Sequence, residues 1–342
     1  MGWPPLFPRL SAAQKLVLAL IPWVAPLLVV GGAAALGNGV LFRWRLDDLR
    51  PLVMAEVRSR LNAEVRVGTL SGNLLGRVRL SQVALDQLTD RRPLLRAKAI
   101  SVRFALWQMV SGRVAPAGAV GKVEIEGLEA WVTRDEQGRL YWAQLIKPRP
   151  PVPPVFQGAI HLRDGLVHYQ DRAWPAGSKR PLEITLRGVR GNATFPHPTL
   201  AYIALSGLSE GDLPAHEVRS ELWLDAANGT TRTDTVVLGV DPERIFVLSN
   251  KSRHLRGLRG TLDARVRTLA SRQSRTPEVS ALVNLAGVTL ETDVLPRPVG
   301  IRGRVRVRRD WAQTEGLVLS CGRSRAVVSG ELADFKQPAG ML

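Results

Sequence analysis

The sequence predicts a mainly β protein: one N-terminal transmembrane helix followed by a long, curled, antiparallel-rich β-sheet with few short helices. Three observations predict this class. An uncharged apolar run extends from residue 16 to 36. Beyond residue 63, apolar and polar residues alternate with a period of two, which is typical of strands with one buried face. Turn-forming Gly, Asn, Asp and Pro residues separate these alternating segments.

Residues 16–36 are long enough to cross a bilayer, since about 20 mostly apolar residues span roughly 30 Å of hydrocarbon. Pro22 and Pro26 are tolerated in membrane helices. A signal peptide cleaved near Ala33–Ala35 is the alternative, but its apolar core is normally about 7–15 residues long. We therefore expect a retained anchor behind a cytoplasmic tail, residues 1–15. The anchor positions are Leu16, Leu20, Trp23, Leu27, Leu28, Val30 and Leu36.

An amphipathic helix is expected at residues 48–62, where Asp48 precedes Pro51 in the first turn. Its apolar residues recur at helical spacing. A first β segment, residues 63–146, follows. Within it, Gly127 is expected to mark a bulge, because the apolar positions change phase there.

A Pro-rich linker at residues 147–156 precedes a second β segment, residues 157–342. Turn residues at 163–165 (Arg-Asp-Gly) and 227–229 (Ala-Asn-Gly) are expected to separate strands. One strand is expected over Leu258–Arg267. Another is expected over Ile301–Arg308, with apolar residues opposite four arginines.

The formal net charge is +17 and the pI about 11.2, which suggests an anionic partner such as nucleic acid or acidic lipid head groups. A solvated, arginine-rich sheet face explains the same composition. We expect no nucleic-acid partner, because basic residues do not interleave with aromatic residues in the stacking manner.

No pattern of catalytic residues is evident. Cys321 is the one cysteine, so an internal disulfide or cysteine-based metal site cannot form. His161 and His168 are an odd number of residues apart and would face opposite ways in one strand. Nucleophile-elbow, phosphate-loop and zinc-ligand spacings are missing. We expect no enzymatic activity, no cofactor and no metal.

A dozen or more one-faced strands with almost no covering helix must bury their apolar face in some other way. Either two sheets close into a sandwich, or one sheet curls so that the apolar face lines a groove covered by lipid. The candidate groove lining is Ile100, Val102, Phe104, Val123, Ile125, Ile184, Leu186, Val305 and Val307.

Three stretches in order resemble the AsmA-like family of the TamB type: VRVGTLSGNLLGRVRLSQVAL (65–85), AKAISVRFALWQMVSGRV (97–114) and VEIEGLEAWVTRDEQGRLYWAQLIKPRPPVPP (123–154). A later RDGLVHY strand (163–169) is also similar. The likeness covers residues 16–171 and extends to the remainder only in style.

The resemblance implies a bacterial inner-membrane protein with a single anchor and a U-shaped, groove-like sheet in the periplasm. It implies transport of phospholipid toward the outer membrane and pairing with an outer-membrane β-barrel partner. The chain is shorter than usual for this family and lacks its characteristic C-terminal domain, so a fragment or shortened member is expected. Two other functions remain open: an adaptor that assists outer-membrane protein assembly by strand addition, and a secreted β-sandwich binding module.

Overall fold

The computed structural model describes residues 62–73, 77–88, 91–105, 120–142, 156–173, 180–197, 199–244, 255–272, 274, 276–308, 311–333 and 339–341. The expected anchor at residues 16–36 lies outside this set, as do all but the last residue of the expected helix at 48–62 and all but Phe156 of the Pro-rich linker. Within the described residues, no helix has the length and hydropathy needed to span a bilayer.

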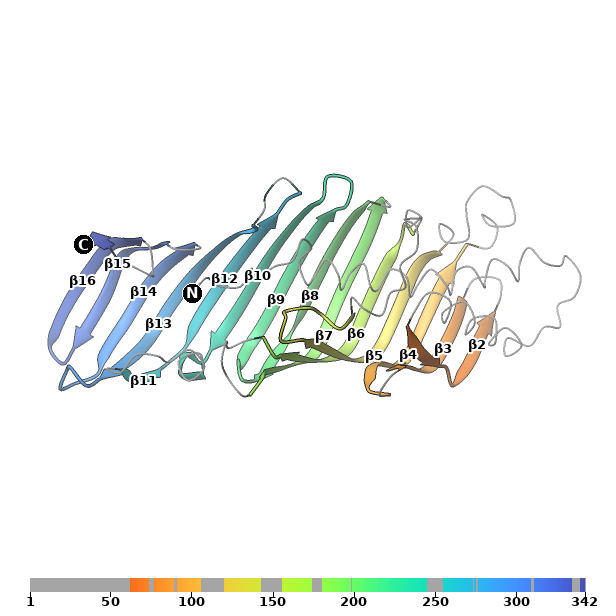
Figure 1. The fold of residues 1–342 in the computed structure, drawn as a ribbon, viewed down its shortest axis with the longest axis horizontal. Coiled ribbons are helices and arrows are strands. Elements are labelled where there is room, and N and C mark those ends of the chain that lie inside the picture. Colours follow the sequence, from red (N-terminus) through yellow and green to blue (C-terminus); the bar gives the residue numbers. More distant parts are fainter. Residues whose placement is uncertain are drawn as a thin grey trace, which may run out of the picture.

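The described chain forms one sheet of 17 strands, which Figure 1 shows side by side along the long axis of the molecule. The strands are β1 (Ala63–Arg66), β2 (Thr69–Asn73), β3 (Arg77–Gln87), β4 (Pro93–Phe104), β5 (Val120–Arg134), β6 (Ala159–Asp171), β7 (Leu182–His197), β8 (Leu200–Gly211), β9 (Ala215–Asp225), β10 (Thr230–Val240), β11 (Leu255–Arg259), β12 (Leu262–Ala270), β13 (Glu278–Thr292), β14 (Val299–Arg308), β15 (Trp311–Cys321), β16 (Ser324–Ala333) and β17 (Ala339–Met341). The prediction of a mainly β protein is confirmed.

Pairing follows chain order almost throughout. Strands β2 to β10 each pair with the next, β10 pairs with β12, and β12 to β17 continue the series. Strands β1 and β11 are short and pair along β3 and β13. Every pair is antiparallel except β5–β6, which is parallel. No pairing among the described residues joins β2 to β16 or β17, so the sheet is open and mixed.

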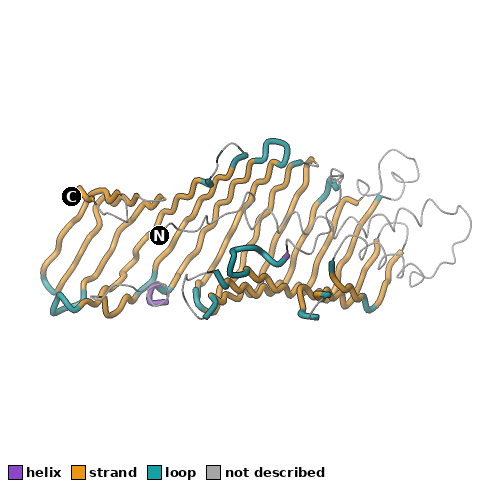
Figure 2. Tube along the Cα trace, in the orientation of Figure 1, coloured by secondary structure: helices purple, strands orange, loops and turns teal. Residues whose placement is uncertain are grey.

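A line of unusual backbone conformations crosses the sheet, and we call it the crease. Left-handed φ angles occur at Gln82 (53°), Gly127 (60°), Asp164 (53°), Gly188 (59°) and Gly287 (84°). Register shifts fall at the corresponding level in most pairs from β6–β7 to β15–β16. Such positions bend strands, and the strand segments on the lower side of Figure 2 turn away from the direction of the long segments.

The crease corrects three expectations. Asp164 does not lie in a turn, because β6 runs through it without interruption. The strand expected over Leu258–Arg267 is two strands, β11 and β12, interrupted at Gly260. Gly127 marks the expected change of face, but no residue is inserted there, since Ala97–Leu128 and Ala99–Glu126 remain regular pairs on either side of it. The turn at 227–229 is confirmed, and it connects β9 to β10.

Two clusters of buried apolar side chains occupy one face of the sheet. The first lies on β1 to β5 and includes Leu85 and Trp142. The second lies on β4 to β9 and includes Val123 and Phe195. Ile100 and Ile125 pack against both clusters, so both belong to one continuous apolar face. The opposite face carries the charged residues.

Candidate functional site

An uncharged row of side chains crosses the apolar face, and we call it the apolar row. It takes one residue from every strand between β2 and β16 except β11, each paired in register with the next. Its members are Leu70, Leu80, Ile100, Ile125, Leu162, Gly191, Leu205, Ser220, Thr235, Val266, Ala281, Val307, Ala312 and Leu332. No charged residue interrupts it, although arginines and carboxylates occupy the neighbouring rows.

Burial falls along this row from one end of the sheet to the other. Leu80 is 2% exposed, whereas Leu205 and Leu332 are each 37% exposed. Beyond Leu224, the buried apolar side chains among the described residues are Val240, Pro242, Val288 and Val299. The apolar face is therefore mostly buried over β1 to β9 and half-buried to exposed over β12 to β16.

The residues predicted to line a groove divide along the same gradient. Val102 and Val123 pair with each other and are buried in the second cluster. Ile184 and Leu186 are half-buried beyond the crease, where they pair with Tyr169 and Val167. Phe104 ends β4, and its side chain is not among those described.

In β14, Val305 and Val307 are half-buried between exposed arginines, as their alternation predicted. Sequence reasoning did not include Leu205, Ala281 and Val283 in the lining. Alternation could have indicated Leu205, but Ala281 and Val283 belong to a continuous apolar run with Leu282, so spacing does not assign them to a face. Their register with distant strands could not be read from spacing either.

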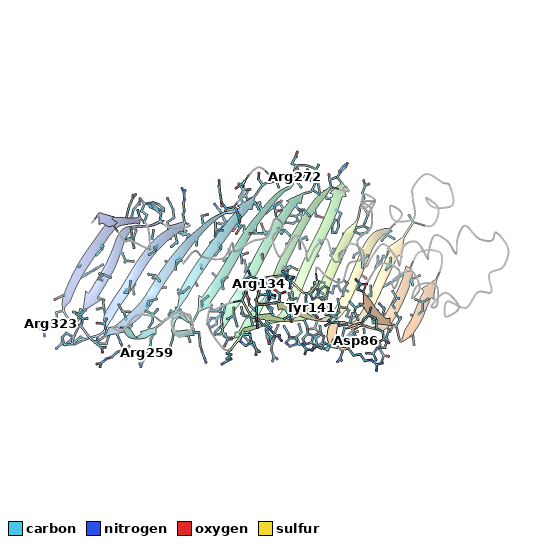
Figure 3. All side chains as sticks on the ribbon, viewed as in Figure 1. Asp86, Arg134, Tyr141, Arg259, Arg272 and Arg323 are labelled. Carbon is cyan, nitrogen blue, oxygen red and sulfur yellow. The ribbon has the colours of Figure 1, made fainter. Side chains whose placement is uncertain are left out.

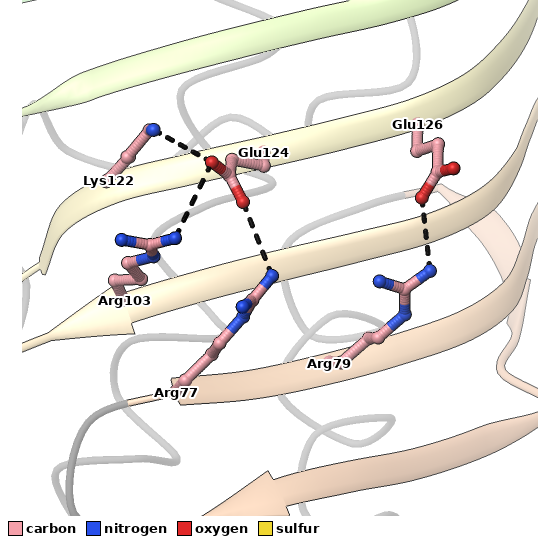
Figure 4. Close-up of polar contacts among 6 residues, drawn as sticks. All are labelled: Arg77, Arg79, Arg103, Lys122, Glu124 and Glu126. Carbon is pink, nitrogen blue, oxygen red and sulfur yellow. Dashed lines mark hydrogen bonds and ion pairs between the residues drawn. The ribbon is translucent and has the colours of Figure 1, made fainter.

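Ion pairs join neighbouring strands on the opposite face. Figure 3 shows the described side chains along the sheet. In Figure 4, Lys122, Arg103 and Arg77 surround Glu124, with nitrogen–oxygen distances of 2.8, 3.9 and 3.4 Å. The hydrogen bond from Lys122 lowers the pKa of Glu124, against an opposing contribution from burial. Arg79 pairs with Glu126 at 3.1 Å. Three cations share the one carboxylate of Glu124, so these pairs neutralise only part of the positive charge on β3 to β5.

Asp234 is the most constrained carboxylate of the charged face. Its side chain is 7% exposed and accepts bonds from Arg265 at 2.8 and 2.7 Å and from Arg267 at 3.0 Å. The hydrogen bond from Arg265 is the main cause that lowers the pKa of Asp234, burial opposes it, and Arg267 adds to the lowering.

We expect Asp234→Asn to destabilise the protein by about 1 kcal/mol at neutral pH, a modest value because both arginines are half exposed to solvent. A lowered folded-state pKa stabilises the fold above the unfolded pKa of about 3.9, and this stabilisation is lost as the pH falls through the folded pKa. The difference in urea midpoint between wild type and variant should therefore shrink below about pH 4. A pH-independent difference would contradict the assignment.

A group of polar side chains beside the first apolar cluster is bonded internally. Asp171 accepts bonds from Arg134 (3.0 Å) and from the Tyr169 hydroxyl (2.9 Å), and burial followed by Asp171 raises the pKa of Tyr169. Nearby, Tyr141 bonds Gln87 (Arg134 and Tyr141 are labelled in Figure 3). This cluster fixes the segment that carries Leu140 and Trp142 onto the first apolar cluster.

His161 and His168 lie on the charged face. The side chains of Ile160, Val167 and Tyr169 pack on the apolar face. His161 follows Ile160, and His168 lies between Val167 and Tyr169, so both imidazole rings lie on the other face. The expectation that the two rings face opposite ways is wrong, because the crease at Asp164 reverses the alternation between them. His168 stacks on Trp131 at 5.4 Å and lies 3.3 Å from Glu129. The described residues contain no group of His, Cys, Asp and Glu suited to a metal.

The class defined by these features is an open mixed β-sheet with one apolar and one ion-paired face. No protein-family model matches the chain. A search of curated proteins likewise returns no match.

Proposed function

We propose that this protein is a membrane-anchored periplasmic scaffold of the AsmA/TamB type that conducts phospholipid between the inner and outer membranes and supports outer-membrane biogenesis. The observation that carries the proposal is the apolar row, which is uncharged from Leu70 to Leu332 and accessible in its C-terminal part. An acyl chain needs a mainly apolar, uncharged lining, and the two hydroxyl groups of the row, on Ser220 and Thr235, bond each other at 2.9 Å.

The length of the row supports this function. Neighbouring strands lie about 4.8 Å apart, so a row through 14 strands extends for roughly 60 Å. That is about twice the roughly 30 Å of a bilayer's hydrocarbon core. A shorter binding pocket would serve one ligand, whereas a surface of this length allows movement along it.

The crease supports a U-shaped groove. Bends that recur at one level in successive strands fold a sheet lengthwise, and the side toward which it folds becomes a trough. We propose that the apolar face lines this trough, with Val305, Val307 and Leu205 in contact with acyl chains. The anchor at residues 16–36 would hold one end at the inner membrane, and an outer-membrane β-barrel is the proposed partner at the other.

Site-specific photocrosslinking in intact cells tests the proposal with the full chain in its membrane. A photoreactive residue at Leu205 probes the apolar row, and one at Ala204 probes the charged face of the same strand. We expect phospholipid adducts at Leu205 and none at Ala204, as measured by mass spectrometry of the purified protein. Adducts only to protein at Leu205 would favour the strand-addition adaptor, and no adduct at either position would favour a closed binding module.

A further inference from the structure

Strand β14 carries four arginines at alternate positions on the charged face: Arg302, Arg304, Arg306 and Arg308, the arginine strip. All four are exposed. Alternate residues of a strand lie roughly 6.8 Å apart, so the strip is a dense line of positive charge. Among the described residues, no ion pair joins any of the four to a carboxylate, in contrast to the paired arginines of β3 and β12.

The strands on both sides supply few carboxylates beside the strip. The residues in register with it on β13 and β15 are Ser280, Leu282, Asn284, Ala286, Trp311, Gln313 and Val318. The nearest carboxylates in the pairing pattern are Glu315 in the β15 bulge, which forms no ion pair among the described residues, and Glu331, which accepts a bond from Gln313 at 3.0 Å. Four unpaired like charges repel one another, so an anionic partner would relieve a cost that the fold leaves uncompensated.

Apolar side chains stand exposed among these arginines. Leu282 is 40% exposed beside Arg306, and Val327 is 65% exposed on β16, one strand beyond Val318. The Arg308 guanidinium lies 5.6 Å from the centre of the Trp311 ring. Exposed aliphatic groups and Trp together with arginine match the interface of a bilayer, where phosphates lie next to acyl chains. A polyanion that lacks an apolar layer could pair with the arginines, but it would leave Leu282 and Val327 exposed to water.

We propose that the arginine strip docks the C-terminal part of the sheet on the surface of an anionic phospholipid bilayer. This surface lies on the face opposite the apolar row, so it goes beyond the proposed transport function and does not depend on it. The phosphates of the head groups would pair with Arg302, Arg304 and Arg306, while Leu282 and Val327 reach the acyl boundary.

The test uses the full chain reconstituted in neutral phosphatidylcholine vesicles and measures its tethering of a second, fluorescent vesicle population. The probe vesicles contain phosphatidylcholine with or without phosphatidylglycerol. We expect tethering only with phosphatidylglycerol, weakening as salt rises. A variant with Arg302→Thr, Arg304→Thr and Arg306→Thr should bind about 100-fold more weakly, given the contribution of each arginine near an anionic surface.

The matched control removes the same number of positive charges from arginines that have acidic partners: Arg77→Thr, Arg79→Thr and Arg219→Thr. Its tethering should stay close to that of wild type. Equal weakening in control and variant would reduce the effect to net charge and overturn the proposal. So would tethering of neutral vesicles, or a strip-dependent affinity for a DNA fragment that exceeds the affinity for anionic vesicles. Phospholipid crosslinking at Leu205 tests the transport function in a separate experiment. The transport proposal and the docking proposal can therefore fail independently of each other.

Discussion

Val283→Glu is expected to remove most lipid from the C-terminal part of the sheet. Val283 is half-buried on the apolar face, in register with Ala264 and Val305. A carboxylate at position 283 would contact the acyl chain and lose its hydrating water. The free-energy cost of this desolvation is well above the roughly 1.4 kcal/mol that corresponds to a tenfold change in affinity. Phospholipid crosslinking from a photoreactive residue at Val305 should fall about tenfold or more.

Leu282→Glu is the matched control for this change. It makes a similar substitution one residue away, on the charged face between Arg265 and Arg306. Crosslinking from position 305 should be unaffected, since position 282 lies on the face opposite the apolar row. Equal loss in both variants, or no loss in Val283→Glu with an unchanged circular dichroism spectrum, would show that Val283 does not line the lipid path. Val102 is a poorer test site because it is 3% exposed, so a charge there would unfold the core.

The second large effect concerns Gly260, which lies between β11 and β12 and beside Gly287 of the crease. Gly260 has a φ of 120°, and a Cβ atom would lie 2.6 Å from the carbonyl oxygen of Gly287 and 2.9 Å from the Cα of Val288. We expect Gly260→Ala to destabilise the protein by about 2–4 kcal/mol, because both the dihedral angle and the contact with backbone are unfavourable.

Gly287→Ala separates these two causes. Gly287 is also left-handed, with a φ of 84°, but a Cβ atom would meet nothing within 4 Å. Its cost should be about 1 kcal/mol, which is the dihedral penalty alone. The urea midpoints of the two variants, measured by circular dichroism, give the comparison. Equal midpoints would mean that β11 and β12 do not approach β13 as closely as described.

The alternation of apolar and polar residues predicted most of the strands, because one face of each strand packs and the other meets solvent. In β14 the alternation of Val305 and Val307 with Arg304 and Arg306 matched the observed exposure. The arrangement of arginines on one face was therefore readable from the sequence alone.

The crease was not readable in the same way. Its residues are of different types, since Gln82 and Asp164 adopt the left-handed conformation alongside the glycines. Inside a strand, non-glycine residues rarely adopt this conformation unless the surrounding structure imposes it, and spacing contains no information on the surrounding strands. The parallel pairing of β5 with β6 was missed for a related reason: alternation is identical in either strand direction.

The nearly sequential strand order makes the architecture quasi-one-dimensional. Each strand contacts its two neighbours and little else, so cooperativity passes from hairpin to hairpin, as it does between the modules of a solenoid. Excising or duplicating one hairpin in the antiparallel meander from β12 to β16 would change the span by roughly 10 Å while keeping the cross-section. The length of the sheet can thus change with the number of hairpins, while each hairpin keeps the same type of contact with its neighbours.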